Sequence, residues 1–417
     1  MIIDDLKTGT ENGRKRVSAR VTWEDCAREQ MEIFIETDPE FAEGLSANPH
    51  AFLVVCTMVA MHHGEKRIRL DAEICPELTD GLVTAMKRFA HWYNWYPSEN
   101  PIVRIEAQKR YRKTLPSTLG RRGMFFSGGV DSLATLRNNR NNFPIEHPSS
   151  IDDGFLVYGL EVEAPQIFDY VMRTVPKIAR DSDLKLIPVY TNLRYLDDSW
   201  RFWEHQFMGA VFSAVAHAFS RRINSVLIAS HFDIPYVENP YGSHPMIDSN
   251  YSSSDLRIKH DRPLSRFEKT RMISDWDIAL ENVRVCNKTT LYESGQLNCS
   301  ACEKCLRTMM ALLACDVLDK SPAFKYDDVS AETVFDTVKM NRTVYSFYPD
   351  LIEPLRKAGR SELAAILQDK LDTYLNPPVV KKPLHRHIVD FVYKMDQDYL
   401  NSRMRRIKHT LQSRAAD

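Results

Sequence analysis

The chain has 417 residues, more than one hydrophobic core usually holds, and this length predicts two or three domains. Apolar residues make up 43% of the sequence, which is enough for packed cores. The 55 Lys and Arg residues nearly balance the 56 Asp and Glu residues, so no overall charge attracts nucleic acid or a membrane surface, and we expect neither as a partner.

The N-terminus and the cysteines indicate the compartment. The first residues contain no apolar region of the kind that signal peptides carry, and no apolar stretch approaches the roughly 20 residues needed to span a bilayer. Eight cysteines are too sparse for a disulfide scaffold in a chain of this length. We therefore expect a cytoplasmic protein.

Residues 1–120 are expected to form an α+β domain of their own, to which the sequence assigns no function. The run at 51–61 fits either a strand or a helix, because nearly all of its residues are apolar. Alternation elsewhere predicts short strands at 31–35, 66–70 and 102–105, and helical spacing predicts a helix at 77–93.

A strand, a glycine-rich turn and a helix follow one another in the middle of the chain. Residues 124–126 predict a short buried strand, and the apolar run that begins at Leu133 predicts a helix. The glycines between them let backbone N–H groups point into one concavity, to which the helix N-terminus adds positive potential. A simple turn is the alternative, but we interpret the motif as a phosphate cradle. Its candidate ligands are Ser127, Gly128, Gly129, Asp131 and Ser132.

Asp131 is the unusual member of this motif. Phosphate groups repel a carboxylate unless it faces a metal ion or orients a donor, so its presence suggests Mg²⁺ beside the phosphates.

Residues 121–320 alternate between strand and helix patterns, as a doubly wound parallel sheet requires. Ligands of such sheets lie beyond the carboxyl ends of the strands, which makes Gly159 a candidate cofactor-binding residue. Further buried strands are predicted at 154–160, 184–190 and 225–229, and a helix with an apolar stripe at 207–219.

A long loop follows the strand at 225–229. It combines histidines, carboxylates and aromatic residues, and long irregular loops inside a compact domain are usually functional or disordered. Packing of a structural loop is the alternative. We interpret the loop as a substrate-binding segment with His231, Asp233, His244 and Asp248 as its candidate residues.

A short amphipathic helix is predicted at 264–273. Arg266 and Lys269 are three residues apart and are therefore neighbours on its surface. They could reach negative charge on phosphate groups held at the glycine-rich turn, although a solvated charged face would look the same.

Four cysteines have the spacing of a metal site. They form the pattern C-x12-C-x2-C-x2-C, and the first of them follows a short strand predicted at 283–285. Four thiolates without a nearby histidine favour a closed tetrahedral Zn²⁺ site, while an iron–sulfur cluster or a redox thiol pair are alternatives. The predicted ligands are Cys286, Cys299, Cys302 and Cys305.

Together, the Ser-Gly-Gly-x-Asp-Ser motif and the cysteine cluster resemble the PP-loop (N-type) ATP pyrophosphatases, and among them the 7-cyano-7-deazaguanine synthase (QueC) family. The resemblance covers roughly 121–315 and implies an adenine nucleotide alpha hydrolase-like fold with ATP at the glycine loop and zinc at the cysteines. Lys269 lies where these enzymes place a lysine before the metal site. The first cysteine gap is longer than usual, and the family's Gly-Tyr-Pro-Asp-Cys motif is absent from the sequence.

The resemblance implies an ATP-dependent ligase. It would adenylate a carboxylate such as a 7-deazaguanine carboxylic acid, release pyrophosphate, and pass the acyl group to ammonia or to an amine of a partner protein, as QueC-like proteins of antiviral defence systems look as if they do. The alternatives are a PP-loop enzyme that thiolates tRNA and an ATP-sensing module without turnover.

The remaining residues, 321–417, are expected to be helical, with helices at 361–375 and from 384 onward. The additional residues on both sides of the PP-loop region could hold a large acceptor, enlarge the core or form a homodimer.

Overall fold

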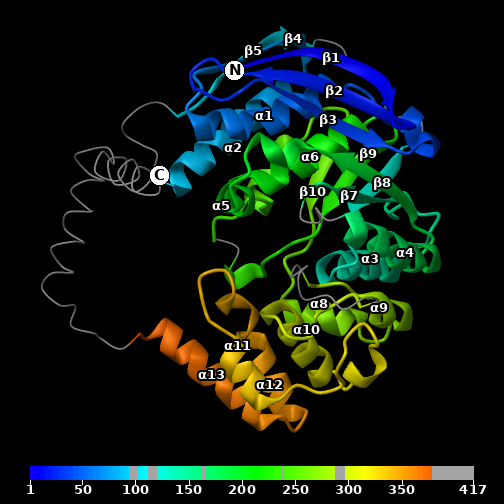
Figure 1. The fold of residues 1–417 in the computed structure, drawn as a ribbon, viewed down its shortest axis with the longest axis vertical. Helices are drawn as coiled ribbons and strands as arrows, with labels where there is room; N and C mark the ends of the chain where they lie inside the picture. Colours follow the sequence, from blue (N-terminus) through cyan, green and yellow to red (C-terminus); the bar gives the residue numbers. More distant parts are fainter. Residues whose placement is uncertain (94–100, 111–119, 161–164, 237–238, 287–295, 378–417) are drawn as a thin grey trace, which may run out of the picture. The chain divides into compact units, whose positions relative to one another are not determined.

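Ten strands form one mixed, mostly parallel sheet in the order β10-β9-β6-β7-β8-β3-β2-β1-β4-β5 (Figure 1). This computed structural model describes residues 1–93, 101–110, 120–160, 165–236, 239–286 and 296–377. The strands are β1 (Ile2–Glu11), β2 (Arg14–Thr22), β3 (Met31–Thr37), β4 (Arg67–Ile74), β5 (Arg104–Lys109), β6 (Arg121–Phe125), β7 (Asp153–Tyr158), β8 (Lys185–Thr191), β9 (Ile223–Ile228) and β10 (Arg257–His260).

The five strands from β6 to β10 are parallel to one another. Because β7 and β8 lie on one side of β6 while β9 and β10 lie on the other, the chain reverses its direction of winding at β6. Ligands of open α/β sheets bind in the crevice that such a reversal leaves at the carboxyl ends of the strands. The glycine-rich turn follows β6 and is therefore placed at this point of the sheet.

The strands before residue 120 continue the same sheet. Strand β3 pairs with β8 in an antiparallel register that places Thr37 opposite Val189. Side chains reinforce the junction, since Thr37 Oγ1 donates to Pro188 O at 2.7 Å and Asn192 Oδ1 accepts from Phe34 N at 2.8 Å. The predicted boundary near residue 120 thus does not interrupt the sheet.

The hairpin of β1 and β2 was not among the predicted strands. Most residues of β1 are exposed, so it lacks the apolar alternation of a half-buried strand. Asn12 and Gly13 between the strands have φ values of 50° and 77°, as a tight hairpin turn needs. This Asn-Gly pair is the sequence signal that could have found the hairpin.

The ambiguous run at 51–61 is helical and completely buried. It belongs to α1, which begins after Asn48, whose side chain accepts from His50 N, and ends at Gly64 in the left-handed conformation with φ 75°. A helix that is apolar on all sides has to be buried. Figure 1 shows α1 beside α2, below the strands β1 and β2.

The predicted strands at 31–35, 154–160, 184–190 and 225–229 are confirmed as β3, β7, β8 and β9, and residues 283–285 form no strand. The α-helices are α1 (Pro49–His63), α2 (Pro76–Trp92), α3 (Val130–Asn142), α4 (Pro165–Asp181), α5 (Trp200–Phe202), α6 (Met208–Ala218), α7 (Pro245–Asp248), α8 (Arg266–Ile273), α9 (Asp277–Asn282), α10 (Glu303–Ala314), α11 (Ala331–Thr337), α12 (Pro349–Lys357) and α13 (Ser361–Leu375).

Residues 1–368 form one compact unit, and every contact described below lies within it. Helix α13 confirms the helix predicted at 361–375, and the helix predicted from 384 lies outside the described residues. No helix in the described part of the chain combines the length and the hydrophobicity needed to cross a bilayer.

Candidate functional site

The glycine-rich turn leads from β6 directly into α3, with Gly129 as the residue before the first turn of the helix. Gly128 has a φ of 74°, and a Cβ there would lie 2.8 Å from Val175 Cγ2, so only glycine fits. The hydroxyl of Ser127 accepts from Gly129 N at 3.3 Å, and Ser132 Oγ donates to Gly129 O at 2.9 Å. The turn therefore presents backbone N–H groups at a helix N-terminus, which is a favourable place for an anion.

Asp131 at the start of α3 forms two ion pairs with α8. Arg266 Nη2 and Lys269 Nζ lie 2.9 Å from its two carboxylate oxygens. Burial alone would raise the pKa of Asp131, but these two cations outweigh it and hold the pKa well below its usual range. Lys269 is only 3% exposed, and it also donates to Ser230 O at 2.6 Å. Three residues predicted from two separate motifs thus meet at the carboxyl end of β6.

The surroundings of this centre contain more N–H donors than acceptors. Arg307 and Arg284 are only 5% and 9% exposed, yet Nε of each guanidinium has no hydrogen-bond partner in the described part of the chain. The same is true of Arg266 Nε. Arg307 Nη1 comes no closer than 3.5 Å to Glu303 Oε1. Since buried donors are nearly always satisfied in folded proteins, this surplus would suit a ligand with several acceptor oxygens.

An aromatic side chain from the C-terminal region covers the same cations. The ring of Phe347 lies 4.0 Å from the Arg307 guanidinium and 5.3 Å from that of Arg266. His231 packs edge-on against Phe347 and stacks on Tyr241 at 4.4 Å. Burial holds the pKa of His231 well below its ordinary value, so its imidazole is neutral. Residues after 320 therefore help to build the site.

A cavity of about 190 Å³ opens beside the turn. Its lining combines polar residues such as Ser127, Asp131 and Arg284 with apolar ones such as Phe126 and Trp203. This arrangement suits a ligand that joins a charged group to a flat apolar ring.

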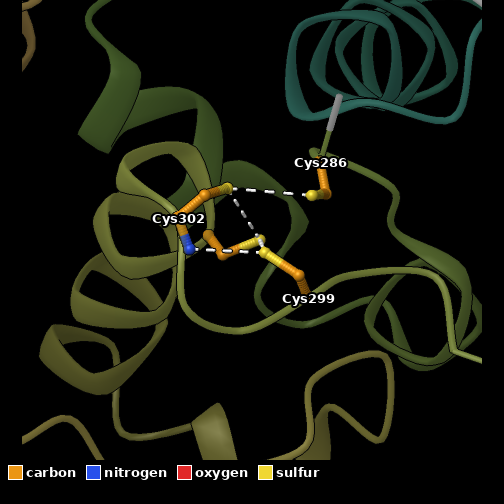
Figure 2. A group of neighbouring side chains, drawn as sticks. Cys286, Cys299 and Cys302 are labelled. Atoms are coloured by element: carbon orange, nitrogen blue, oxygen red, sulfur yellow. Dashed lines mark hydrogen bonds between the residues drawn. The ribbon is translucent and has the colours of Figure 1, made fainter. Parts of the chain in front are cut away.

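The four predicted cysteines lie together, and Figure 2 shows the labelled thiols pointing toward one another. The Sγ atoms of Cys286 and Cys302 are 3.7 Å apart, as are those of Cys299 and Cys305, and Cys302 and Cys305 are 3.5 Å apart. Zn–S bonds of about 2.3 Å would place tetrahedral sulfur ligands about 3.8 Å apart, whereas a disulfide needs about 2.05 Å. The cluster thus fits a metal such as Zn²⁺.

A sharp turn and several hydrogen bonds hold the cysteine segments next to one another. Ser300 between the two middle cysteines adopts a φ of 56°, which turns the chain sharply enough for Cys302 N to donate to Cys299 Sγ at 3.3 Å. The buried side chain of Asn298 accepts from Val285 N at 2.8 Å and donates to Val283 O at 2.8 Å. These bonds hold the segment of the first cysteine against the turn, as supporting groups do in metal sites.

The cysteine cluster also adjoins the glycine-rich turn. Arg284 N donates to Gly128 O at 2.9 Å, two residues before Cys286. Arg307 follows Cys305 by two residues in the first turns of α10. An ion bound to the cysteines would therefore fix the backbone that carries Arg284 and Arg307, whose Nε atoms have no partner among the described residues.

The four substrate-binding candidates fall into two groups. His231 faces the Asp131 centre, and Asp233 has a raised pKa because of burial and of the nearby carboxylate of Asp350. His244 and Asp248 instead belong to a hydrogen-bonded cluster around α7, in which Asp248 Oδ1 accepts from His244 N at 3.1 Å.

The backbone geometry explains why residue 159 is a glycine. It ends β7 with a φ of 93°, and a Cβ there would collide with Thr191 O of the neighbouring strand. Glycine is therefore required for the close approach of the two backbones.

The sequence did not single out Arg284, Arg307, Phe347 or Asn298. The available signal for the arginines was their position, since each lies two residues from a predicted metal ligand. Phe347 carried no signal, because a lone aromatic residue in a helical region is usually part of a core.

Comparison of the chain with profiles of known protein families, with curated proteins and with solved structures found no match.

Proposed function

We propose that the protein is a PP-loop ATP pyrophosphatase of the QueC-like type, with a doubly wound sheet of the adenine nucleotide alpha hydrolase kind. The observation that carries this proposal is the surplus of buried N–H donors on Arg266, Arg284 and Arg307 around the glycine-rich turn. A triphosphate supplies several charged oxygens, and the turn and the helix N-terminus add backbone donors for them.

The residues present suit Mg²⁺ together with ATP. Mg²⁺ is usually held by one or two carboxylates plus substrate phosphates, and Asp131 is the carboxylate at this turn. Its oxygens pair with Arg266 and Lys269 in the structure. Phosphate oxygens can take over these two cations, which leaves the carboxylate to the ion.

The cysteines would hold Zn²⁺ in a structural role. Four thiolates complete a tetrahedral shell and leave no position for a substrate. The ion would keep Arg284 and Arg307 in place, one beside Gly128 and the other over Phe347.

The proposed reaction has two steps. A carboxylate oxygen of the acid attacks the α-phosphorus of ATP, the bond to the β-phosphate oxygen breaks, and pyrophosphate leaves with an acyl adenylate left behind. A neutral amine then attacks the acyl carbon, AMP departs with its bonding electrons, and the amine loses a proton. Lys269, Arg266 and Arg307 would stabilise the charge on the departing pyrophosphate. The cavity beside Trp203 suits a flat heteroaromatic acid such as a 7-deazaguanine carboxylic acid.

Release of pyrophosphate tests this proposal. The full chain is incubated with ATP, Mg²⁺ and a panel of aromatic acids that includes 7-deazaguanine carboxylic acid. Ser127→Ala and Arg307→Met should lower the rate at least about 100-fold, while Arg257→Met, which changes an exposed arginine on β10, should not. ATP that raises the melting temperature without any pyrophosphate release would instead identify a sensing module.

The acceptor is tested separately. Ammonium and candidate partner proteins are added to the complete reaction, and the products are weighed by intact mass spectrometry. Conversion of the free acid to an amide or nitrile identifies ammonia as the acceptor, whereas an ATP-dependent mass increase on a protein identifies a protein amine.

A further inference from the structure

We propose that His62, His63 and Asp197 form a second metal site, which takes a divalent transition ion such as Zn²⁺ and shares no residue with the cysteine cluster. Among the described residues these three groups bring one ligand atom each to within 4.8 Å of one another. Nε2 of His63 lies 2.8 Å from Asp197 Oδ2, and Nε2 of His62 lies 3.9 Å from the same oxygen. Tetrahedral ligands at about 2.0–2.1 Å from Zn²⁺ are about 3.3 Å apart, which lies between these two distances.

Aromatic neighbours hold both imidazoles in place. The ring of His62 stacks on Phe202 with a centroid distance of 4.1 Å. The ring of His63 packs edge-on against Trp23 at 5.2 Å. The two histidines are the last residues of α1, and Gly64 turns the chain away immediately after them. Binding an ion therefore requires little additional ordering of the ligands.

The carboxylate is oriented from its other side. Asp197 is 4% exposed, and its Oδ1 accepts from Ser199 N at 2.8 Å. This bond leaves Oδ2 facing the two imidazoles, and a ligating carboxylate in a metal site is commonly held in this way. A single histidine would be enough for a structural hydrogen bond to Asp197. Convergence of two imidazoles on one oxygen is the arrangement of a two-histidine, one-carboxylate site.

The nearby Arg28 sets the electrostatics of the site. Its Nη1 lies 3.8 Å from Asp197 Oδ2 and 3.4 Å from His63 Nε2, while its Nη2 donates to Leu196 O at 2.8 Å. This guanidinium repels a bound cation and favours an anionic fourth ligand such as hydroxide or chloride. Arg28→Gln should therefore tighten binding of the ion.

The site would bridge the two parts of the sheet. His62 and His63 come from α1, which packs against β1 and β4, and Asp197 follows β8 directly after the short turn at Leu193–Leu196. An ion here would connect the end of α1 with the segment that follows β8, close to where β3 pairs with β8. Because the ion would bind only the folded chain, its binding should raise the melting temperature.

Metal content and Co²⁺ spectra test the site in the full chain. After dialysis against micromolar Zn²⁺, elemental analysis should find two ions per chain in the wild type and one in His62→Ala and in Asp197→Asn. His91→Ala, which removes an exposed histidine near the end of α2, should keep both ions. With Co²⁺, the first ion should give the intense thiolate band of the cysteine cluster, and the second should add only weak absorption without a sulfur band.

Affinities give a second readout. The second ion should bind at least about tenfold more weakly to His62→Ala than to the wild type, and more tightly to Arg28→Gln. A wild-type chain that binds a single ion with a thiolate spectrum would show that these residues form a hydrogen-bonded cluster only. A second ion that is unaffected by both His62→Ala and Asp197→Asn would also overturn the proposal.

Discussion

Asp131 and Asp248 both contact cationic or histidine side chains in the same unit of the chain. Their surroundings differ in whether the neighbouring donors all have hydrogen-bond partners. Asp248 is fully buried, and its oxygens accept from Ser243 Oγ at 2.7 Å, His260 Nδ1 at 2.8 Å and His244 N at 3.1 Å. Each of these donors is thereby satisfied. Around Asp131, in contrast, the cations still have N–H groups without a partner in the described part of the chain.

The difference is the one expected between a structural polar cluster and a ligand site. A cluster whose donors and acceptors match stabilises the fold as it stands, whereas a cluster with surplus buried donors becomes fully satisfied only when a ligand supplies acceptors. Both aspartates were candidate site residues on sequence grounds. The accounting of hydrogen bonds assigns them different roles.

The largest expected effect is a loss of activity when the cluster around Asp131 is changed. Lys269→Met removes a cation that would stabilise departing pyrophosphate, so the rate of pyrophosphate release should fall about 100- to 1,000-fold. Lys259→Met, at an exposed lysine on β10, is the control. Near-normal turnover in Lys269→Met would mean that the surplus donors do not serve the reaction.

Changes in the cluster around Asp248 should lower stability instead. Asp248→Ala leaves three donors without their acceptor and should lower the free energy of unfolding by about 3–5 kcal/mol, measured by urea denaturation. Asp131→Ala also leaves Lys269 without its carboxylate, but here inorganic pyrophosphate should restore stability and should bind more tightly than to the wild type, because the competing carboxylate is gone. Equal rescue of both variants by pyrophosphate would remove the distinction.

Two buried histidines, His50 and His217, should make the stability of the fold depend on pH. Burial lowers the pKa of His50 to about 2 and that of His217 to about 4. The unfolded chain therefore takes up protons below pH 6.5 that the folded chain does not, so stability is complete above pH 6.5 and falls as the pH drops. Between pH 7 and pH 5 each histidine should remove about 2 kcal/mol from the free energy of unfolding.

Urea titrations at the two pH values measure this loss. His217→Gln should make stability less dependent on pH by about half, and His91→Gln, at an exposed position, should leave the dependence unchanged. An unchanged slope in His217→Gln would show that other groups cause the acid sensitivity.

The smallest effect is expected within the glycine-rich turn. Gly128→Ala places a Cβ at a positive φ and against Val175, which should cost about 1–3 kcal/mol of stability. Gly129→Ala meets only Arg284 O at 3.3 Å and Ser127 Oγ at 3.4 Å, without a positive φ, and should cost less. Melting temperatures of the two variants decide this order, and a larger loss in Gly129→Ala would contradict the geometry of the turn.

The sequence predicted the elements whose burial is continuous. Strands β7 and β9 are covered on both faces and appear as apolar runs, so their positions could be predicted from the sequence. Strands β1 and β10 lie in exposed or edge positions without such a run, and they were missed. The run at 51–61 stayed ambiguous because full burial removes the helical periodicity that would have identified it.

The candidate site was predictable where its residues are neighbours in the sequence. The glycine-rich turn and the three cysteines from Cys299 to Cys305 are local patterns. The pairing of Lys269 with Asp131 joins residues 138 positions apart, and no local spacing encodes such a contact. Arg307 and Phe347 look in the sequence like an ordinary helix charge and an ordinary core residue, so their meeting over the site became visible only in the fold.

The pairing between β3 and β8 also has a consequence during synthesis. Thr37 leaves the ribosome long before its partner Val189. At about 5–20 residues per second, β3 waits roughly 8–30 s for β8 to emerge. Through this interval one edge of the early strands stays unpaired, and an open strand edge is a template for pairing with another chain. The yield of folded protein should therefore depend on translation speed and on chaperones that cover this edge, even where the finished fold is stable.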